Sequence, residues 1–258
     1  MGTVTSADGT TIAYERSGSG PPLVLVDGAM CYRASGPMRP LAAALSSAFT
    51  VYIYDRRGRG ESGDTPPYAV GREVDDLRAL VDEAGGSASA YGISSGAALV
   101  LAAAADGVAF ERIALYEPPF PADRTASRSY TDHLAAHLAA GRRGDAVSLF
   151  MTTVGMPPEV VAGMRQQPFW PMFEAIAPTL AYDDAILNEP GAPHATAKKV
   201  TVPTLVLDGA ESPRFLREAA RTTAAAIPGA AHQSLPGQTH DVSPDALAPA
   251  LTSFFLPA

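Results

Sequence analysis

The chain has 258 residues, of which 47% are hydrophobic and 18% are charged, so a disordered or fibrous protein is excluded. Its formal net charge of -8 argues against nucleic acid as a partner, because phosphate backbones are also negative and no basic stripe offsets the repulsion locally. The length suits one large α/β domain with an insertion.

Short β-rich segments alternate with Ala- and Leu-rich helical segments along most of the chain. Residues 3 to 18 predict two strands joined by a turn at Asp8-Gly9. Further strands are expected at 22 to 26, 50 to 55, 89 to 93, 112 to 117 and 202 to 208, and helices at 37 to 47, 70 to 84, 95 to 105, 213 to 226 and 243 to 254. The alternation predicts a mostly parallel sheet flanked by helices, with an antiparallel start.

The alternation stops between Pro118 and Lys199. The pattern there is helical, with scattered prolines and no convincing strand, and residues 131 to 154 and 157 to 180 predict helices that Gly and Pro interrupt. We therefore expect a helical cap at 119–198, inserted into a core made of 1–118 and 199–258.

Cys31 is the single cysteine, so no intrachain disulfide can form, which fits a reducing compartment. The N-terminal residues show no basic segment followed by an apolar run, and no stretch approaches the roughly 20 apolar residues that a membrane span needs. We expect a complete, cytoplasmic protein without a membrane partner, and a homodimer stays open.

The segment Gly92-Ile93-Ser94-Ser95-Gly96 joins a short strand directly to an Ala- and Leu-rich helix. A G-x-S-x-G pattern in a strand-turn-helix context predicts a nucleophilic serine on a tight turn, where flanking glycines leave room. The helix N-terminus supplies backbone N–H groups that favour developing negative charge. Ser94 is therefore the predicted nucleophile, whereas Ser95 alone could be an ordinary helix cap.

A serine hydroxyl needs a base to take its proton during attack, and His240 is the predicted base. It lies between an expected last strand and a terminal helix. His133 and His137 are spaced four apart in the cap, but they lack the intervening Glu and a third ligand, so no metal is expected. His194 and His232 are expected to be structural or exposed.

Several segments resemble, in chain order, the α/β-hydrolase superfamily. Residues 24 to 30 resemble its loop after the third strand, 55 to 62 the loop after the fourth, and 237 to 240 the late histidine loop. The resemblance covers essentially the whole chain and implies the α/β-hydrolase fold. It also implies a triad in the chain order serine, acid, histidine.

The acid departs from the commonest pattern of that family. An Asp usually follows the seventh strand, but Ser212 stands at that place, and a neutral hydroxyl cannot stabilise an imidazolium as a carboxylate does. Some members, including certain haloalkane dehalogenases and the zearalenone lactonases, take the acid from the end of the sixth strand, where Glu117 stands. Glu117 is therefore the predicted acid, with Glu211 and Asp208 as alternatives.

An oxyanion hole is expected from the backbone N–H of Ser95 and that of Gly28 or Ala29. Asp27 replaces a His that is frequent in the family. The Asp-Gly pair, the double serine, Glu117 and the cap tryptophan Trp170 resemble the zearalenone lactonases. Trp170 and Met30 are the predicted substrate contacts, although Trp170 could equally pack the cap with its apolar neighbours Phe169, Met172 and Phe173.

The predicted function is hydrolysis of a small-molecule carboxylic ester or lactone through an acyl-serine intermediate, with no metal and no organic cofactor. Acyl transfer, cyclisation or perhydrolysis on the same triad, and a non-catalytic small-molecule binder, remain alternatives because a fold does not fix a reaction. Residues 58 to 63 match a G-x-G-x-x-G pattern, but Pro66 and Pro67 stand where a phosphate-binding helix must begin. We therefore expect a turn near the active-site mouth and no nucleotide site.

Overall fold

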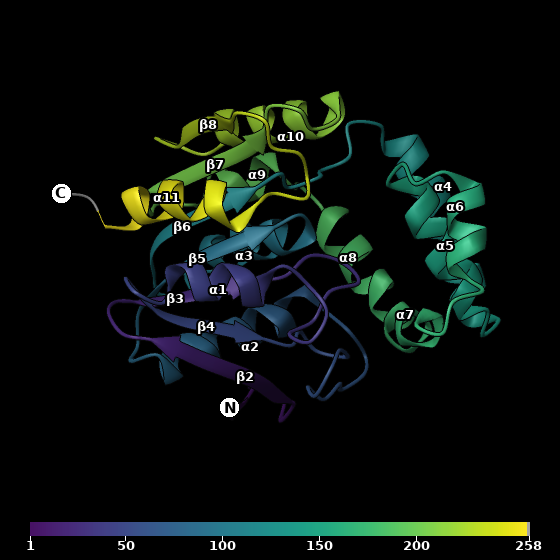
Figure 1. Cartoon of the computed structure of the whole chain (residues 1–258), viewed down its shortest axis with the longest axis horizontal. Helices are drawn as coiled ribbons and strands as arrows, with labels where there is room; N and C mark the ends of the chain where they lie inside the picture. The colour runs from purple at the N-terminus through teal and green to yellow at the C-terminus, as the bar shows by residue number, and fades with distance from the viewer. Residues whose placement is uncertain (257–258) are drawn as a thin grey trace.

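The centre of the molecule is an eight-stranded sheet with the order β1-β2-β4-β3-β5-β6-β7-β8, seen in a computed structural model that describes residues 1–256 (Figure 1). The strands are β1 (Gly2–Thr5), β2 (Thr11–Gly18), β3 (Pro22–Val26), β4 (Thr50–Tyr54), β5 (Ala88–Ile93), β6 (Phe110–Tyr116), β7 (Thr204–Gly209) and β8 (Ala231–Leu235). β1 and β2 are antiparallel, and β2 pairs antiparallel with β4, whereas β3 to β8 run parallel. The predicted mostly parallel sheet with an antiparallel start is confirmed.

The inner strands are buried on both faces. Every residue of β5 and of β7 is buried, as a parallel strand covered by helices on both sides requires. β8 lies at the edge of the sheet, and its first three residues are exposed. The carboxyl ends of the parallel strands all lie along one side of the sheet, which we call the carboxyl edge, and ligands bind beside this edge in open α/β sheets.

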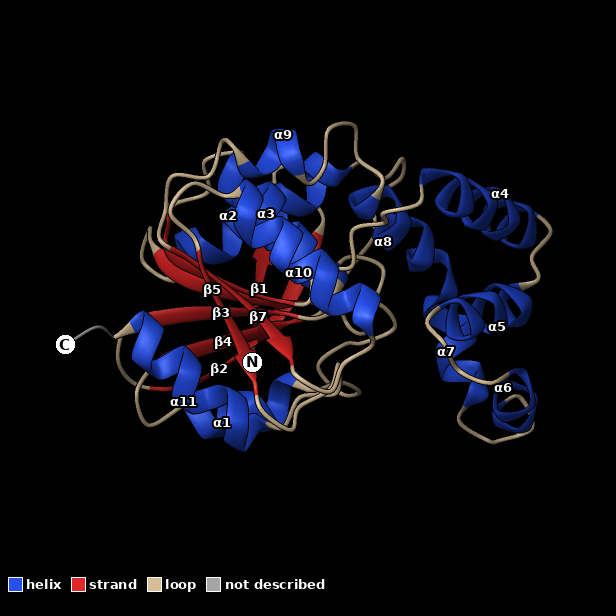
Figure 2. Ribbon diagram, turned by 90° about the horizontal axis from the view of Figure 1, so that it is seen from above, coloured by secondary structure: helices blue, strands red, loops and turns tan. Residues whose placement is uncertain are grey.

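Helices cover both faces of the sheet (Figure 2). One face carries α1 (Met38–Leu45) and α11 (Pro244–Phe255), and the other carries α2 (Val70–Glu83), α3 (Ser95–Ala105) and α10 (Arg214–Ala226). Alternate residues of the five strands β3 to β7 enter two different apolar clusters. Leu25 packs with α1 and α11, while Val24 and Val26 pack with α2 and α3.

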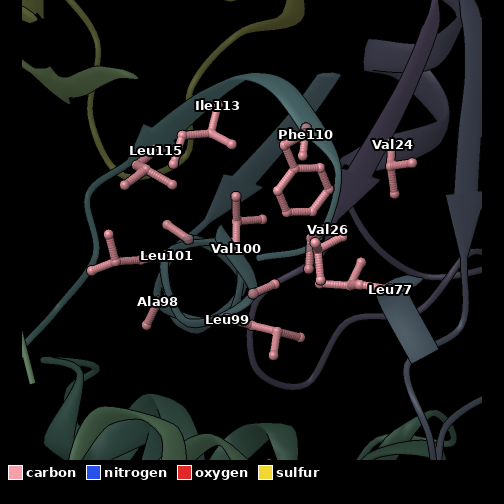
Figure 3. Packing of buried hydrophobic residues seen from close by; sticks show 14 of the residues in the cluster. Val24, Val26, Leu77, Ala98, Leu99, Val100, Leu101, Phe110, Ile113 and Leu115 are labelled. Carbon is pink, nitrogen blue, oxygen red and sulfur yellow. The ribbon is translucent and has the colours of Figure 1, made fainter. Parts of the chain in front are cut away.

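α3 is apolar over nearly its whole length because it lies between the sheet and other helices. Val100 and Leu101 of α3 are fully buried in one cluster with Ile113 and Leu115 of β6 (Figure 3). Burial of each such side chain stabilises the fold by roughly 1.5–3 kcal/mol. This packing fixes the helix, and with it the turn that precedes the helix.

The segment between β6 and β7 is helical, and no strand lies in it among the described residues. Its helices are α4 (Arg124–Ala139), α5 (Arg143–Thr153), α6 (Pro158–Met164), α7 (Trp170–Ile176), a 3-10 helix (Ala177–Thr179), α8 (Leu180–Leu187) and α9 (His194–Ala197). We call residues 119–198 the cap segment. Helices α4 to α7 stand away from the sheet, and α8 lies between them and the core (Figure 1).

The first and last helices of the cap segment differ from the sequence-based prediction in where they begin or pack. α4 begins seven residues before the expected helical stretch, because the side chain of Asp123 accepts the N–H groups of Thr125 and Ala126 and caps the helix there. α9 packs on α3 and α10, and Ala197 belongs to the same apolar cluster as α3. The last turn of the segment therefore lies in the helical layer of the core.

Within residues 1–256, no helix is both long enough and apolar enough to cross a membrane.

Candidate active site

Ser94 occupies a strained turn between β5 and α3. Its φ of 57° and ψ of -129° lie outside the regions that non-glycine residues ordinarily adopt. A Cβ on Gly92 would collide with the backbone of Gly96, and a Cβ on Gly96 would collide with the carbonyl oxygens of Val26 and Asp27, so both positions require glycine. The N–H of Ser94 donates to the carbonyl oxygen of Tyr116 at 2.9 Å, which ties the turn to β6.

His240 and Glu117 form a close pair at the carboxyl edge of the sheet, where the Ser94 turn also lies. The Nδ1 atom of His240 lies 2.6 Å from Oε2 of Glu117, whose side chain is completely buried. The other carboxylate oxygen, Oε1, accepts the N–H of Gly209 at 2.8 Å. With Nδ1–H donating to Glu117, the Nε2 atom of His240 is left as a proton acceptor.

The alternative acids lie elsewhere. Glu211 is exposed, and the carboxylate of Asp208 lies 2.7 Å from Nε2 of His232 on the neighbouring strand. Ser212 is buried, and its hydroxyl has no hydrogen-bond partner among the described residues. Of the three acids considered from the sequence, Glu117 is the one that the structure brings to His240.

Backbone strain gathers at this edge. Among the described residues, the non-glycine residues with positive φ are Met30 at 60°, Ser94 at 57° and Glu117 at 46°. They follow β3, β5 and β6, three adjacent strands of the sheet. Each such conformation costs on the order of 1–3 kcal/mol, and residues held in this way cluster at functional sites.

The loop after β3 lies directly against Ser94. A Cβ built on Gly28 would lie 3.1 Å from Cβ of Ser94 and 3.7 Å from its Oγ, so the backbone of Gly28 and the hydroxyl of Ser94 are neighbours. The backbone N–H of Ser95 belongs to the first turn of α3, where N–H groups lack partners within the helix. Of the predicted donors, the structure thus places Gly28 and Ser95 next to the predicted nucleophile, and Ala29 follows Gly28 in the same loop.

Asp27, at the start of this loop, is a buried carboxylate. Its exposed fraction is 2%, and Oδ1 has no hydrogen-bond partner among residues 1–256. Burial raises the pKa of Asp27 to about 7, although the guanidinium groups of Arg59 and Arg56 oppose the rise. The negative charge of this side chain therefore depends on pH in the neutral range.

Two buried arginines behind the loop were not anticipated from the sequence. Arg59 donates through Nη1 to the carbonyl oxygens of Gly28 at 2.6 Å and Cys31 at 3.2 Å, and Arg56 donates through Nη1 to that of Asp27 at 3.3 Å. Both belong to the turn after β4, the segment that also contains the G-x-G-x-x-G pattern. As expected, this segment is a turn near the site and no helix follows it directly.

Trp170 and Met30 lie in one apolar cluster of the cap segment. Met30 is 7% exposed and Trp170 is 4% exposed, and the cluster also contains Leu134 and Leu180. The indole N–H of Trp170 donates to Oε1 of Glu174 at 3.1 Å. Met30 therefore links the loop beside Ser94 to the interior of the cap segment, while Trp170 is a packed residue of that interior.

The remaining histidines show no metal site. His133 is exposed, and His137 accepts a hydrogen bond at Nδ1 from Nε of Arg142 at 3.3 Å. In the part of the chain that the structure describes, no group of three or more His, Cys, Asp or Glu side chains could hold a metal ion.

Comparison with known proteins gives consistent results. The sequence profile described as "Alpha/beta hydrolase family" matches residues 17–250. The crystal structure of an alpha/beta hydrolase from Sphaerobacter thermophilus DSM 20745 is 53% identical, with 99% of this chain and 100% of that chain covered and a TM-score of 0.89.

Two more distant structures share the fold. A thermophilic esterase from Thermogutta terrifontis is 23% identical over 98% of this chain and 97% of its own, with a TM-score of 0.75. The enol-lactonase from Burkholderia xenovorans LB400 is 24% identical over 98% of this chain and 99% of its own, with a TM-score of 0.70. At these identities the similarity shows the fold alone. The predicted α/β-hydrolase fold and superfamily are confirmed.

Proposed function

The chain belongs to the alpha/beta hydrolase family, and from that premise we propose that it is a serine hydrolase that cleaves a carboxylic ester or lactone through an acyl-Ser94 intermediate. The observation that carries the proposal is the bond between His240 and the buried Glu117, at the edge of the sheet where the strained Ser94 turn lies. A buried carboxylate bound to a histidine, with a serine on such a turn, is the arrangement that activates a hydroxyl as a nucleophile.

In the proposed first half-reaction, Oγ of Ser94 attacks the carbonyl carbon of the substrate. Nε2 of His240 takes the hydroxyl proton, and Glu117 stabilises the resulting imidazolium through Nδ1–H. The C=O bond opens to a tetrahedral intermediate with a negative oxygen. When that intermediate collapses, the C–O bond to the leaving alcohol breaks, and His240 returns its proton to the alcohol oxygen.

In the second half-reaction, water attacks the acyl-Ser94 ester. His240 takes a proton from the water and a second tetrahedral intermediate forms. When it collapses, the bond between the acyl carbon and Oγ of Ser94 breaks, His240 returns the proton to Oγ, and the carboxylic acid is released. A lactone gives one product carrying both groups, because the leaving alcohol and the acid remain joined. Every proton in this cycle passes through His240, and the atoms balance without a cofactor.

The backbone N–H of Ser95 and that of Gly28 or Ala29 are proposed to bind the negative oxygen of both intermediates. The proximity of Gly28 to Ser94 and the place of Ser95 in the first turn of α3 support this assignment. Loss of one donor of this kind costs about 10² to 10³ in kcat in serine hydrolases. Met30 and Trp170 are proposed to border the site for the substrate, supported by the apolar cluster that contains both.

The proposal is tested by labelling with a fluorophosphonate probe, followed by mass spectrometry of the peptide that contains Ser94. A panel of aryl esters and macrocyclic lactones, with release of free acid as the readout, tests the substrate class and distinguishes hydrolysis from acyl transfer to another acceptor. We expect labelling at Ser94 and free acid from at least one panel member. The proposal would be overturned if the probe does not label Ser94 in the wild type. It would also be overturned if the Ser94→Ala variant keeps full activity and is still labelled at another residue.

A further inference from the structure

Asp183 is a buried carboxylate of the cap segment that bonds to the core of the enzyme. It lies on α8 and is 4% exposed. Its Oδ1 atom accepts hydrogen bonds from Oγ of Ser95 and Nη1 of Arg56, both at 2.7 Å, and Oδ2 accepts from Nη2 of Arg59 at 2.7 Å. All three donors belong to the core, so this one side chain of the cap segment is tied to the core at three points.

The same three donors hold the residues of the proposed oxyanion hole. Ser95 supplies one backbone N–H, and its side chain points to Asp183. Arg59 holds the carbonyl oxygen of Gly28, in the loop that supplies the second N–H. Arg56 holds the carbonyl oxygen of Asp27, the residue before it. The two proposed N–H donors follow different strands, β3 and β5. The side chains of Ser95, Arg56 and Arg59, which hold these donors, all bond to Asp183.

We propose that Asp183 is a positioning residue of the hydrolytic reaction. Through Ser95 and Arg59 it fixes the positions of the two backbone N–H donors of the oxyanion hole relative to each other. The inference rests on the proposed function, because it concerns the same nucleophile and the same intermediates. It makes the shape of the oxyanion hole depend on where α8 sits on the core. The cap segment thereby acts on the rate of the chemical step as well as on access of the substrate.

The buried ion pairs around Asp183 favour one fixed arrangement of these side chains. Arg56 also makes two hydrogen bonds to Glu73, at 2.8 and 2.9 Å, so each buried guanidinium faces a buried carboxylate. Burial alone would raise the pKa of Asp183, but Arg59, Arg56 and the hydrogen bond from Ser95 hold it below its ordinary value. The ionised side chain accepts charge-assisted hydrogen bonds, which have well-defined geometry and resist displacement.

A purely structural anchor would behave differently. If Asp183 only fastened α8 to the core, its loss would lower the thermal stability of the protein and weaken substrate binding, which appears in KM. A donor displaced from the oxyanion hole instead weakens the interaction made in the transition state, which appears in kcat. It also weakens binding of a trifluoromethyl ketone, whose adduct with Ser94 places a negative oxygen in the hole.

The experiment compares Asp183→Asn with Asp184→Asn. Asp184 is the adjacent residue, and it accepts hydrogen bonds from Thr131 at 2.8 Å and Asn188 at 2.9 Å, both within the cap segment. For Asp183→Asn we expect kcat on a short aryl ester to fall about 10- to 100-fold with KM changed less than about threefold, and trifluoromethyl ketone affinity to fall by a similar factor to kcat. Asp184→Asn should stay within about twofold of the wild type in both measurements.

Ser95→Ala provides a second variant, which deletes the hydrogen bond from Ser95 to Asp183 and the longer one, at 3.4 Å, that the same hydroxyl accepts from Nη1 of Arg56. Its kcat should fall about three- to tenfold. An unchanged kcat and ketone affinity in Asp183→Asn, or a loss confined to KM, overturns the inference. If Asp183→Asn does not fold, an unchanged kcat in Ser95→Ala overturns it. Fluorophosphonate labelling of the wild type distinguishes a failure of the proposed function from a failure of this inference. If Ser94 is not labelled, the proposed function is wrong and the role of Asp183 is wrong with it. If Ser94 is labelled but the variants are unaffected, only the role of Asp183 is wrong.

Discussion

Nδ1 of His240 lies 2.6 Å from Oε2 of Glu117, a residue 123 positions earlier in the chain. The second oxygen of Glu117 accepts the N–H of Gly209 at the end of β7, so both oxygens of a completely buried carboxylate have partners. The carboxylate therefore has one orientation. A histidine bound to it is held in one ring orientation and one tautomer, which is what a general base in this position requires.

Replacement of Glu117 by Gln should lower kcat about 10²- to 10⁴-fold with little change in KM. The amide is nearly the same size, but it is neutral and can donate to Nδ1, which favours the unproductive tautomer of His240. Single-turnover kinetics on an aryl ester measure the effect. Glu211→Gln is the matched control, because Glu211 is exposed on the loop after β7 and should have a much smaller effect. The opposite ranking of these variants would return the acid to that loop.

Ser94→Ala should abolish turnover, with a loss on the order of 10⁴-fold or more, while the fold persists. The hydroxyl supplies the bond-forming atom, whereas the turn is held by the backbone bond to Tyr116 and by close packing of Gly92 and Gly96. Alanine meets the same backbone restriction as serine at this φ, so the melting temperature should change little. Circular dichroism checks the fold, and near-normal esterase activity in this variant would refute the assignment of the nucleophile.

The local parts of the site could be predicted from the sequence. A strand, a G-x-S-x-G turn and an apolar helix are contiguous, so the elbow at Ser94 is visible in about 20 letters of sequence. The acid could not be predicted from local sequence, because Glu117 follows β6 and His240 follows β8, and the two residues meet only through the strand order β6-β7-β8. The resemblance to a family supplied that neighbourhood, and the structure brings these two side chains together.

The buried charge cluster could not be predicted in the same way. A run such as Asp55-Arg56-Arg57-Gly58-Arg59 has the composition of an exposed loop, and nothing local shows that its three arginines are fully buried. Asp183 and Asp184 are adjacent on α8 and point to different sides of the helix. Which of the two faces the core depends on how α8 packs, and that contact lies about 90 to 130 residues away in the sequence.

Trp170→Ala should raise KM for bulky esters more than for small ones and leave kcat for small esters within a few-fold, since the residue belongs to the apolar interior that Met30 joins to the site. It should also lower the melting temperature, because truncation of a buried tryptophan typically costs about 3–5 kcal/mol. Trp170→Phe keeps most of the volume and should show both effects more weakly. Phe169, the residue directly before α7, is 39% exposed, so Phe169→Ala is the control. If Trp170→Ala leaves KM unchanged for both bulky and small esters, Trp170 does not belong to the substrate site.

The last prediction concerns the charge of Asp27. Its pKa of about 7 lies above the ordinary value of 3.8, because burial disfavours the ionised form. Between these two pH values the folded protein holds a proton that the unfolded chain has released. The contribution of Asp27 to the free energy of unfolding is therefore complete below about pH 4 and is lost as the pH rises towards and through 7.

Asp27→Asn removes this ionisation, so the variant should become more stable relative to the wild type as the pH rises from 5 to 8. The gain in the free energy of unfolding should be about 3 kcal/mol over that range, since the difference builds up over about two pH units and one pKa unit corresponds to about 1.4 kcal/mol. Urea unfolding at several pH values measures it, and the difference between the two proteins cancels the titration of all other groups. Asp132→Asn, at an exposed position on α4, is the control for the loss of a carboxylate. If Asp27→Asn gives a constant difference, then Asp27 is ionised throughout this range and Arg56 and Arg59 neutralise it.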